Sequence, residues 1–570
     1  MPNEEPKLTA VEGIKQESRL LRGTIADEIA SPTACFNSDN IQLLKFHGSY
    51  QQDDRDLRTE RKKAGLDKAY SMMLRLRIPG GRCTADQFLS MLEVCEELGN
   101  STIKITTRQT IQLHGIVKDN LRPTIKRVNE LALSTLAACG DVNRNIMCCP
   151  AKRVSPVHAE LQRITDELTE AMAPKTPAYH ELWVSEPDST EKELVGGGQE
   201  TEPLYGPTYL PRKFKMGIAL PEDNCIDIYT QDLGLLAVVR EGQIVGYNVL
   251  VGGGMGTTPA KKTTYPALGK RMAFVTPEQV VGVCQAILKV QRDNGNRTDR
   301  KLARMKYLVD QWGIDKFRQE VETYFGDSLE DCKPDDVTGV DDHMGWQEQG
   351  DGKWSYGLNI ENGRLYDNEQ VQYKAAIRAI CEEFDTEIRM TGHQSLIFTD
   401  IDAAKKDRLI ELITQHHIRT TEQTSTVRRW SMACVALPTC GLAITESERR
   451  LPGLIDGLEQ PLAKLGLDRE RFTIRMTGCP NGCARPYNAD MALVGKAKDR
   501  YTLYVGGGWL GNRLAYIYKD LVPDSQVVDE MVGVFAAYKA NRQEGESIGD
   551  FCSRVGKDDL QEMASHAERP

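Results

Sequence analysis

Two distant stretches of the chain carry the same succession of hydrophobic and polar patterns. In the first, a strand-like segment and a turn precede an amphipathic stretch over 86–98 and alternating residues over 103–114. In the second, the same succession leads to 371–384 and then to 387–398. Apolar residues at a helical period indicate a helix, and strict alternation indicates a half-buried strand. Each stretch therefore predicts strand, turn, helix, strand, turn and strand.

A second pair of matching segments follows in the same order. The segment 213–219 leads to a glycine run over 251–256, and the segment 472–478 leads to a similar run over 505–511. Chance similarity between generic strand patterns is the competing explanation, but it would rarely recur twice in the same order. We therefore predict an internally duplicated α+β protein with mixed α/β sheets, pseudo-two-fold symmetry and a cleft between its halves.

The composition is that of a globular protein with several domains. The 570 residues are 40% hydrophobic and 27% charged, and no apolar run reaches the about 18 residues of a membrane span. The polar N-terminus lacks the apolar core of a signal peptide, so a cytoplasmic location is expected. A formal net charge of −10 disfavours nonspecific nucleic-acid binding. The sequence thus predicts neither a membrane nor a nucleic-acid partner.

Four of the fifteen cysteines form two closely spaced pairs. Cys434 and Cys440 have the spacing C-x5-C, and Cys479 and Cys483 have the spacing C-x3-C, in loops that contain Pro and Gly. Four thiolates suit an iron–sulfur cluster or a zinc ion. Because zinc sites usually use C-x2-C or C-x4-C pairs, a cluster is the favoured interpretation. A structural zinc protein and a set of unrelated buried thiols are the alternatives.

Basic residues gather in several strand-like or loop-like segments, namely at Arg75, Arg77, Arg108, Arg144, Lys213 and Lys215. Arg75 and Arg77 alternate, as do Lys213 and Lys215, so each pair is predicted to share one face of a strand. Taken singly, each residue could be a solvated strand end. Taken together, they predict a cage for small oxyanions or for a polycarboxylate cofactor. The glycine runs match neither the dinucleotide fingerprint nor a phosphate-binding loop.

The motifs around these residues resemble those of the sulfite/nitrite reductase family, whose members contain sirohaem and a [4Fe–4S] cluster. The resemblance covers nearly the whole chain, from 45–55 to 548–551. Its strongest motifs are Ser431-Met-Ala-Cys434, Thr477-Gly-Cys-Pro-Asn-Gly-Cys-Ala-Arg-Pro486, Leu210-Pro-Arg-Lys-Phe-Lys215 and Asn143-Arg-Asn145. The family is also internally duplicated, in agreement with the repeat.

The resemblance implies a role for each candidate site residue. Cys434, Cys440, Cys479 and Cys483 would be the ligands of the [4Fe–4S] cluster, and the sulfur of Cys483 would also bind the sirohaem iron. The residues that would surround sulfite are Arg75, Arg144, Lys213 and Lys215. The residues that would lie near the macrocycle are Arg108, Gln112, His114 and Asn481.

The resemblance also implies a domain organisation. Residues 1–70 would be an N-terminal extension, and 71–145 and 346–425 would be paired ferredoxin-like half-domains. Residues 146–345 would form a first sirohaem-binding-type domain with the substrate-side basic residues. Residues 426–570 would form a second such domain with the four cysteines, which gives three domains around a central cofactor cleft.

The implied activity is the six-electron reduction of sulfite to sulfide for cysteine biosynthesis, by the haemoprotein component of an assimilatory sulfite reductase. Because the chain shows no flavin-binding or nicotinamide-binding segment, its electrons must come from a partner. An NADPH-oxidising flavoprotein with FAD and FMN, in a hetero-oligomer, is slightly favoured over ferredoxin. Nitrite reduction by the same cofactors is a further alternative. A separate hypothesis is that Cys139 forms a thioether with Tyr50.

Overall fold

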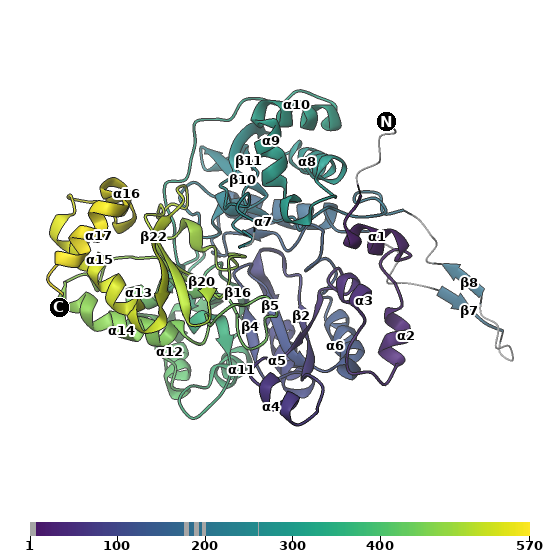
Figure 1. Cartoon of the computed structure of the whole chain (residues 1–570), viewed down its shortest axis with the longest axis horizontal. Helices are drawn as coiled ribbons and strands as arrows, with labels where there is room; N and C mark the ends of the chain where they lie inside the picture. Colours follow the sequence, from purple (N-terminus) through teal and green to yellow (C-terminus); the bar gives the residue numbers. More distant parts are fainter. Residues whose placement is uncertain (1–6, 176–181, 187–192, 197–200, 260, 570) are drawn as a thin grey trace.

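The computed structural model describes residues 7–175, 182–186, 193–196, 201–259 and 261–569. It contains four five-stranded sheets and one two-stranded hairpin. The hairpin, β7 (Leu182–Val184) and β8 (Glu193–Gly196), projects from the opposite side of the molecule to the C-terminal helices (Figure 1). The four larger sheets form two matching pairs, as the repeat predicted.

The first pair of sheets contains the two stretches with matching patterns. One sheet has the order β1 (Ser49–Asp53), β2 (Tyr70–Arg75), β5 (Ile111–Ile116), β4 (Ile103–Ile105) and β15 (Arg364–Leu365). The other has the order β13 (Gly345–Glu348), β14 (Lys353–Leu358), β17 (Leu396–Asp402), β16 (Glu387–Met390) and β3 (Arg82–Thr84). The short edge strands are exchanged: β15 pairs with β4 of the first sheet, and β3 pairs with β16 of the second.

The two predicted helices form beside these sheets as α5 (Ala85–Glu97) and α11 (Tyr373–Glu383). Thr84 caps α5 through a reciprocal pair of hydrogen bonds with Gln87, which satisfies donors at the helix start. The helices α6 (Lys118–Glu130) and α12 (Lys406–Gln415) complete the layer. Apolar side chains from both sheets form one continuous core, so the exchanged strands join the half-domains into a single unit.

The second pair of sheets shares one topology. The first has the order β12 (Lys270–Val275), β11 (Gln243–Val251), β10 (Leu233–Arg240), β9 (Met216–Ala219) and β6 (Met147–Cys148). The second has the order β18 (Ser431–Ala433), β19 (Ile474–Thr477), β20 (Met491–Ala497), β21 (Arg500–Val505) and β22 (Tyr516–Pro523). In each, three parallel strands are followed by two antiparallel ones.

The remaining helices cover these sheets or belong to the N-terminal segment before β2 (Figure 1). Those of the first half are α7 (Pro156–Ala171), α8 (Val280–Asn294), α9 (Met305–Trp312) and α10 (Ile314–Phe325). Those of the second half are α13 (Thr426–Arg429), α14 (Leu451–Lys464), α15 (Val527–Asn541), α16 (Ile548–Val555) and α17 (Lys557–His566). The N-terminal helices are α1 (Ala10–Glu17), α2 (Ile25–Ala30), α3 (Ser38–Leu43) and α4 (Arg58–Lys63).

The strand registers relate the two halves residue by residue. In the first half, Met216 pairs with Leu233 and Gly217 pairs with Met147. In the second, Ile474 pairs with Met491 and Arg475 pairs with Met432. In each half, the connection between two neighbouring parallel strands contains a short 3-10 helix, η3 (Ile228–Thr230) or η8 (Pro486–Asn488). The residue before each of these helices has the left-handed conformation, with φ 52. The same backbone path is therefore built twice.

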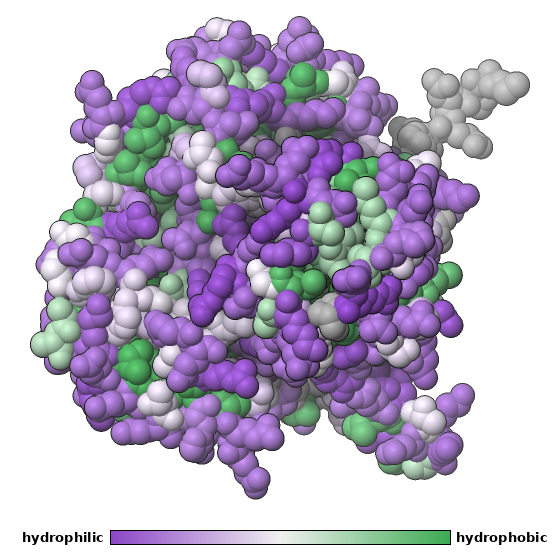
Figure 2. Space-filling model, turned by 90° about the vertical axis from the view of Figure 1, so that its left-hand side faces the viewer, coloured by the Kyte–Doolittle hydropathy of each residue, from purple (hydrophilic) through white to green (hydrophobic). Residues whose placement is uncertain are grey.

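The surface shows no extended apolar area on the face drawn in Figure 2, where hydrophilic residues dominate and hydrophobic ones form small separate patches. Within the described ranges, no helix combines the length and the apolar character that crossing a membrane requires.

Candidate active site

The four cysteines lie in two loops that follow neighbouring parallel strands. Cys434 follows β18, and Cys479 and Cys483 lie between β19 and η8. The backbone N–H of Gly478 donates to Cys434 Sγ at 3.4 Å, and Asn481 Nδ2 donates to Cys479 Sγ at 3.4 Å. N–H groups directed at sulfur stabilise thiolates that ligate a metal centre. The sequence-predicted Asn481 thus belongs to the cysteine loop itself.

The chemistry of the four thiols fits a polynuclear cluster. Burial, and then the neighbouring Cys483, raise the pKa of Cys479 to about 11, and the same two causes raise the pKa of Cys434. Such crowded thiols become thiolates when a cationic centre takes their protons' place. In the described part of the chain, no three of these sulfur atoms lie within 4.8 Å of one another, whereas ligands of one tetrahedral zinc ion lie about 3.3–3.8 Å apart. The spacing disfavours the zinc alternative.

Cys483 differs from the other three cysteines in its exposure. Its side chain is exposed, while those of Cys434 and Cys440 are half-buried and that of Cys479 is buried. Its charge also acts on Lys215, which lies in the segment before β9 of the first half. Cys483 therefore faces the space between the halves, where a second cofactor would meet it.

The loop of Cys440 is held by the N-terminal segment. Arg55 Nη1 donates to the carbonyl oxygens of Cys440 at 3.2 Å and Ala443 at 2.6 Å. The backbone N–H of Arg55 donates to Pro438 O at 3.2 Å. The segment predicted as an N-terminal extension thus contributes both β1 and the hydrogen bonds of Arg55 to the cysteine loop. Sequence reasoning missed Arg55, although it lies at the end of a motif that carried the resemblance.

The basic residues approach from the first half. Lys213 and Lys215 are half-buried, and in the described ranges neither ammonium group has a hydrogen-bond or ion-pair partner. Burial, and then Lys215 and Arg304, hold the pKa of Lys213 well below its usual range. Burial, followed by Arg108 and Arg304, does the same for Lys215. Like charges that crowd one space without a counter-ion form a binding site for an anion.

Arg75 and Arg144 border the same space. Arg75 ends β2 and donates through Nη1 to Cys139 Sγ at 3.2 Å, and Arg144 donates through Nη2 to Gly140 O at 3.1 Å. Arg144 Nε is buried without a partner in the described structure. Arg77 does not join them. Beyond the end of β2 at Arg75, Arg77 forms an isolated bridge with Ser134, and its side chain donates to the carbonyl of Thr169 in α7 instead.

The residues predicted near the macrocycle lie beside this cluster. Gln112, with its amide oxygen toward Arg75, accepts from Arg75 Nε at 3.0 Å. His114 is buried, and its Nε2 lies 3.3 Å from the side-chain amide of Gln112. Burial, and to a smaller extent the charge of Arg364, keep the pKa of His114 well below its usual range. Arg108 donates to Gln231 Oε1 at 2.8 Å and to Met216 O at 2.9 Å. These residues are therefore fixed by the fold, and their contact with a macrocycle stays a prediction.

The sequence motifs did not single out two further basic residues near the site, Arg304 and Lys306. Arg304 forms a buried ion pair with Asp232 at 2.7 Å. Lys306 Nζ donates to the carbonyls of Gly254 at 3.0 Å and Gly256 at 2.9 Å, which fixes the first glycine run. The basic run 300–306 was the available signal.

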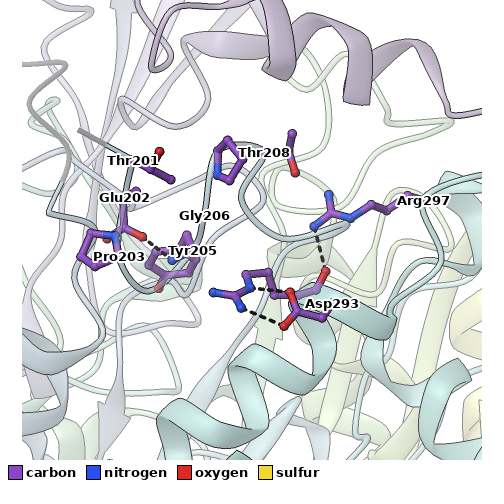
Figure 3. A pocket seen from close by; sticks show the side chains of 10 residues that line it. Thr201, Glu202, Pro203, Tyr205, Gly206, Thr208, Asp293 and Arg297 are labelled. Carbon is purple, nitrogen blue, oxygen red and sulfur yellow. Dashed lines mark hydrogen bonds and ion pairs between the residues drawn. The ribbon is translucent and has the colours of Figure 1, made fainter. Parts of the chain in front are cut away.

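A surface pocket of ≈ 560 Å³ lies elsewhere, next to α8 (Figure 3). Its charged groups satisfy one another. Arg292 forms a double hydrogen bond with Asp293, and Arg297 donates to the backbone carbonyl of Arg292 at 2.9 Å. Because these groups are already paired and none of the predicted site residues lines the pocket, it is not the candidate active site.

Comparison with known proteins identifies the class to which this fold and this site belong. Residues 139–329 and 429–569 match the nitrite and sulphite reductase 4Fe-4S domain. Residues 66–131 and 347–416 match the nitrite/sulfite reductase ferredoxin-like half domain. The chain belongs to the nitrite and sulfite reductase family.

Within that family, several similar curated proteins share a name. The sulfite reductase (NADPH) hemoprotein beta-component of Staphylococcus haemolyticus is 47% identical over 553 residues, which cover 97% of this chain and 96% of that protein. The protein of the same name from Geobacillus thermodenitrificans is 45% identical and covers 96% of this chain and 95% of its own length. The solved structure of Mycobacterium tuberculosis NirA protein matches with a TM-score of 0.77 at 25% identity, over 98% of both chains.

Proposed function

We propose that this chain is the haemoprotein component of an assimilatory sulfite reductase, which reduces sulfite to sulfide with six electrons for cysteine biosynthesis. One observation carries the proposal: the exposed Cys483 is near enough to Lys215 to oppose the lowering of its pKa by burial, and among the described residues Lys215 has no side-chain partner. An electron-carrying centre and an anion site therefore meet at one place. The name shared by relatives that cover nearly the whole chain supports sulfite as the substrate.

The residues present fit the two cofactors of the family. Cys434, Cys440 and Cys479 would hold the [4Fe–4S] cluster, and Cys483 would hold both the cluster and the sirohaem iron. When bound, the two centres would supply electrons to the substrate. The carboxylates of sirohaem need cationic partners, and the basic cluster with the unpartnered Arg108 Nε and Arg144 Nε offers them.

The side chains of this chain would do the rest of the chemistry. Arg75 and Arg144 would orient the oxygens of sulfite, because guanidinium groups stay charged and bind oxygens bidentately. Lys213 and Lys215 would stabilise charge on the leaving oxygens and donate protons, since their lowered pKa values make them stronger acids than an ordinary lysine. Three oxygens would leave as water.

The electron donor in this proposal is an NADPH-oxidising flavoprotein subunit with FAD and FMN, in a hetero-oligomer. The names of the relatives favour it over ferredoxin. The free thiols throughout the chain suit a reducing compartment, so a cytoplasmic location belongs to the same proposal.

The test is sulfide production by the purified, cofactor-loaded protein. We expect sulfide from sulfite with NADPH and the flavoprotein, little with reduced ferredoxin, and a lower kcat/KM for nitrite than for sulfite. Faster turnover of nitrite would make the chain a nitrite reductase. A colourless protein that contains only zinc would refute the assignment altogether.

A further inference from the structure

The first half contains a second group of metal-ligating side chains, outside the site described above. It consists of Cys149, Asp223, Cys225 and His343, all buried, whose ligand atoms lie within 4.8 Å of one another. Cys149 directly follows β6, Asp223 and Cys225 lie between β9 and η3, and His343 lies just before β13. Segments that are far apart in the sequence therefore converge on one point.

The pseudo-two-fold symmetry places this group opposite the four-cysteine site. Met147 pairs with Gly217 of β9 as Met432 pairs with Arg475 of β19, so Cys149 takes the place that Cys434 has in the second half. Cys225 comes two residues before the left-handed Asp227, and Cys483 comes two residues before the left-handed Arg485. Two of the four residues are therefore the counterparts of metal-site cysteines.

The side chains of this group lie in direct contact with one another. Asp223 Oδ2 forms an ion pair with His343 Nε2 at 3.1 Å, although the two atoms are not aligned for a hydrogen bond. Asp223 Oδ1 is occupied by the backbone N–H groups of Cys225 at 3.0 Å and Asp341 at 3.1 Å. Asp223 Oδ2 is therefore held toward the centre of the group, where His343 Nε2 also lies 4.0 Å from Cys149 Sγ.

We propose that Cys149, Asp223, Cys225 and His343 bind one zinc ion. Two thiolates, one imidazole and one carboxylate form a tetrahedral donor set that suits zinc better than magnesium, calcium or manganese. The site has to contract on binding, because zinc ligands lie about 3.3–3.8 Å apart. The contraction is short, and it would replace the contacts of Asp223 and Cys149 with His343 by metal bonds.

The surroundings support a bound ion. Asp341 Oδ2 lies 3.9 Å from His343 Nδ1, in the position of a carboxylate that orients a ligating histidine. A surface pocket of ≈ 460 Å³ lined by Cys149, His158 and Arg389 provides an entry path. Since protein groups supply all four ligands, the zinc ion would be structural. It would hold the segment between α10 and β13, which carries His343, to the first half.

Metal analysis of the cofactor-loaded protein tests this proposal. We expect one zinc ion per chain in addition to iron, in protein purified without chelators from zinc-supplemented cells. Zinc-edge X-ray absorption should show two sulfur and two nitrogen or oxygen ligands. The double variant C149A/C225A should lose the zinc but keep the sirohaem and cluster absorption, whereas C284A, which removes another buried thiol of the first half, should keep both.

Several results would overturn the proposal. One is a cofactor-loaded protein without stoichiometric zinc. Another is zinc retention by the double variant, and a third is an intact mass that lacks two hydrogens because Cys149 and Cys225 form a disulfide. Where the double variant does not fold, the metal content and X-ray absorption of the unaltered protein decide. None of these readouts depends on sulfite turnover, so they stand apart from the proposed enzymatic function.

Discussion

Asp227 and Arg485 occupy corresponding positions in the two halves, and they form an ion pair with each other. Both have φ 52 and both precede a short 3-10 helix. Arg475 adds a second ion pair to Asp227 at 2.8 Å. Arg485 also donates to Thr107 O at 2.7 Å and Gly392 O at 3.0 Å, one in each half-domain. The pseudo-two-fold axis thus passes through a charged junction of all the parts that surround the site.

Replacing Asp227 by Asn should destabilise the protein strongly. It would leave Arg475 and Arg485 buried without their counter-charge, which costs about 3–5 kcal/mol. Denaturant unfolding of the purified variant measures the loss. The control is D335N, which breaks the surface ion pair with Arg240 and should cost no more than about 1 kcal/mol. Equal losses in the two variants would contradict a special role for the junction.

The same carboxylate predicts how stability depends on pH. Burial opposes the charge of Asp227, but Arg475 and Arg485 outweigh it and lower its pKa to about 2. Because the folded-state pKa lies below the unfolded-state value of about 3.9, the ionised carboxylate stabilises the folded protein at pH values above about 4. This stabilisation is lost as the pH falls toward about 2. The difference in unfolding free energy between D227N and the unaltered protein should therefore shrink below about pH 4.

Replacing Lys215 by Met should lower sulfite turnover by about 10²-fold or more, because a proton donor and a charge beside the substrate are lost. The visible spectrum should stay unchanged, since Lys215 is not proposed as a metal ligand. K289M, which alters a lysine on α8, is the matched control. Normal sulfite turnover in K215M would remove this residue from the proposed mechanism.

Much of this architecture was predictable from local patterns, and the rest depends on long-range contacts. The helices α5 and α11 follow from their apolar periods, and the cysteine pairs are recognisable because their ligands are close in sequence. The exchanged strands β3 and β15 are too short to show a period. Cys225 and His343 each stand alone in the sequence, so only the folded chain brings them together.

Replacing Leu442 by Ser should slow electron delivery from the protein partner. Leu442 lies two residues after Cys440 and is 69% exposed, so the proposed cluster comes near the surface there. We expect a lower sulfite-dependent rate of NADPH oxidation with the flavoprotein, and an unchanged rate with a small-molecule reductant. I517S alters an exposed residue of β22 and serves as the control. Equal loss with both reductants would point to a damaged cluster instead.

Replacing Cys483 by Ser should remove both cofactors, because this thiol is proposed to hold cluster and sirohaem together. The measurements are iron content and visible absorption. C381S, which changes a half-buried cysteine of α11, should retain both. A C483S protein with a complete cluster and normal sirohaem absorption would show that the two centres do not share this ligand.

The Tyr50–Cys139 thioether should appear as an intact mass two hydrogens below the sequence mass after the cofactors are removed. Cys139 is buried, and its charge raises the pKa of Tyr50 after the larger effect of burial, so the two side chains lie close together. Dioxygen would accept the two electrons and two protons that bond formation releases. Y50F should have its full sequence mass, and a peptide map should join 50 to 139 only in the unaltered protein. An unshifted mass of that protein would leave Cys139 as a thiol that accepts the hydrogen bond from Arg75.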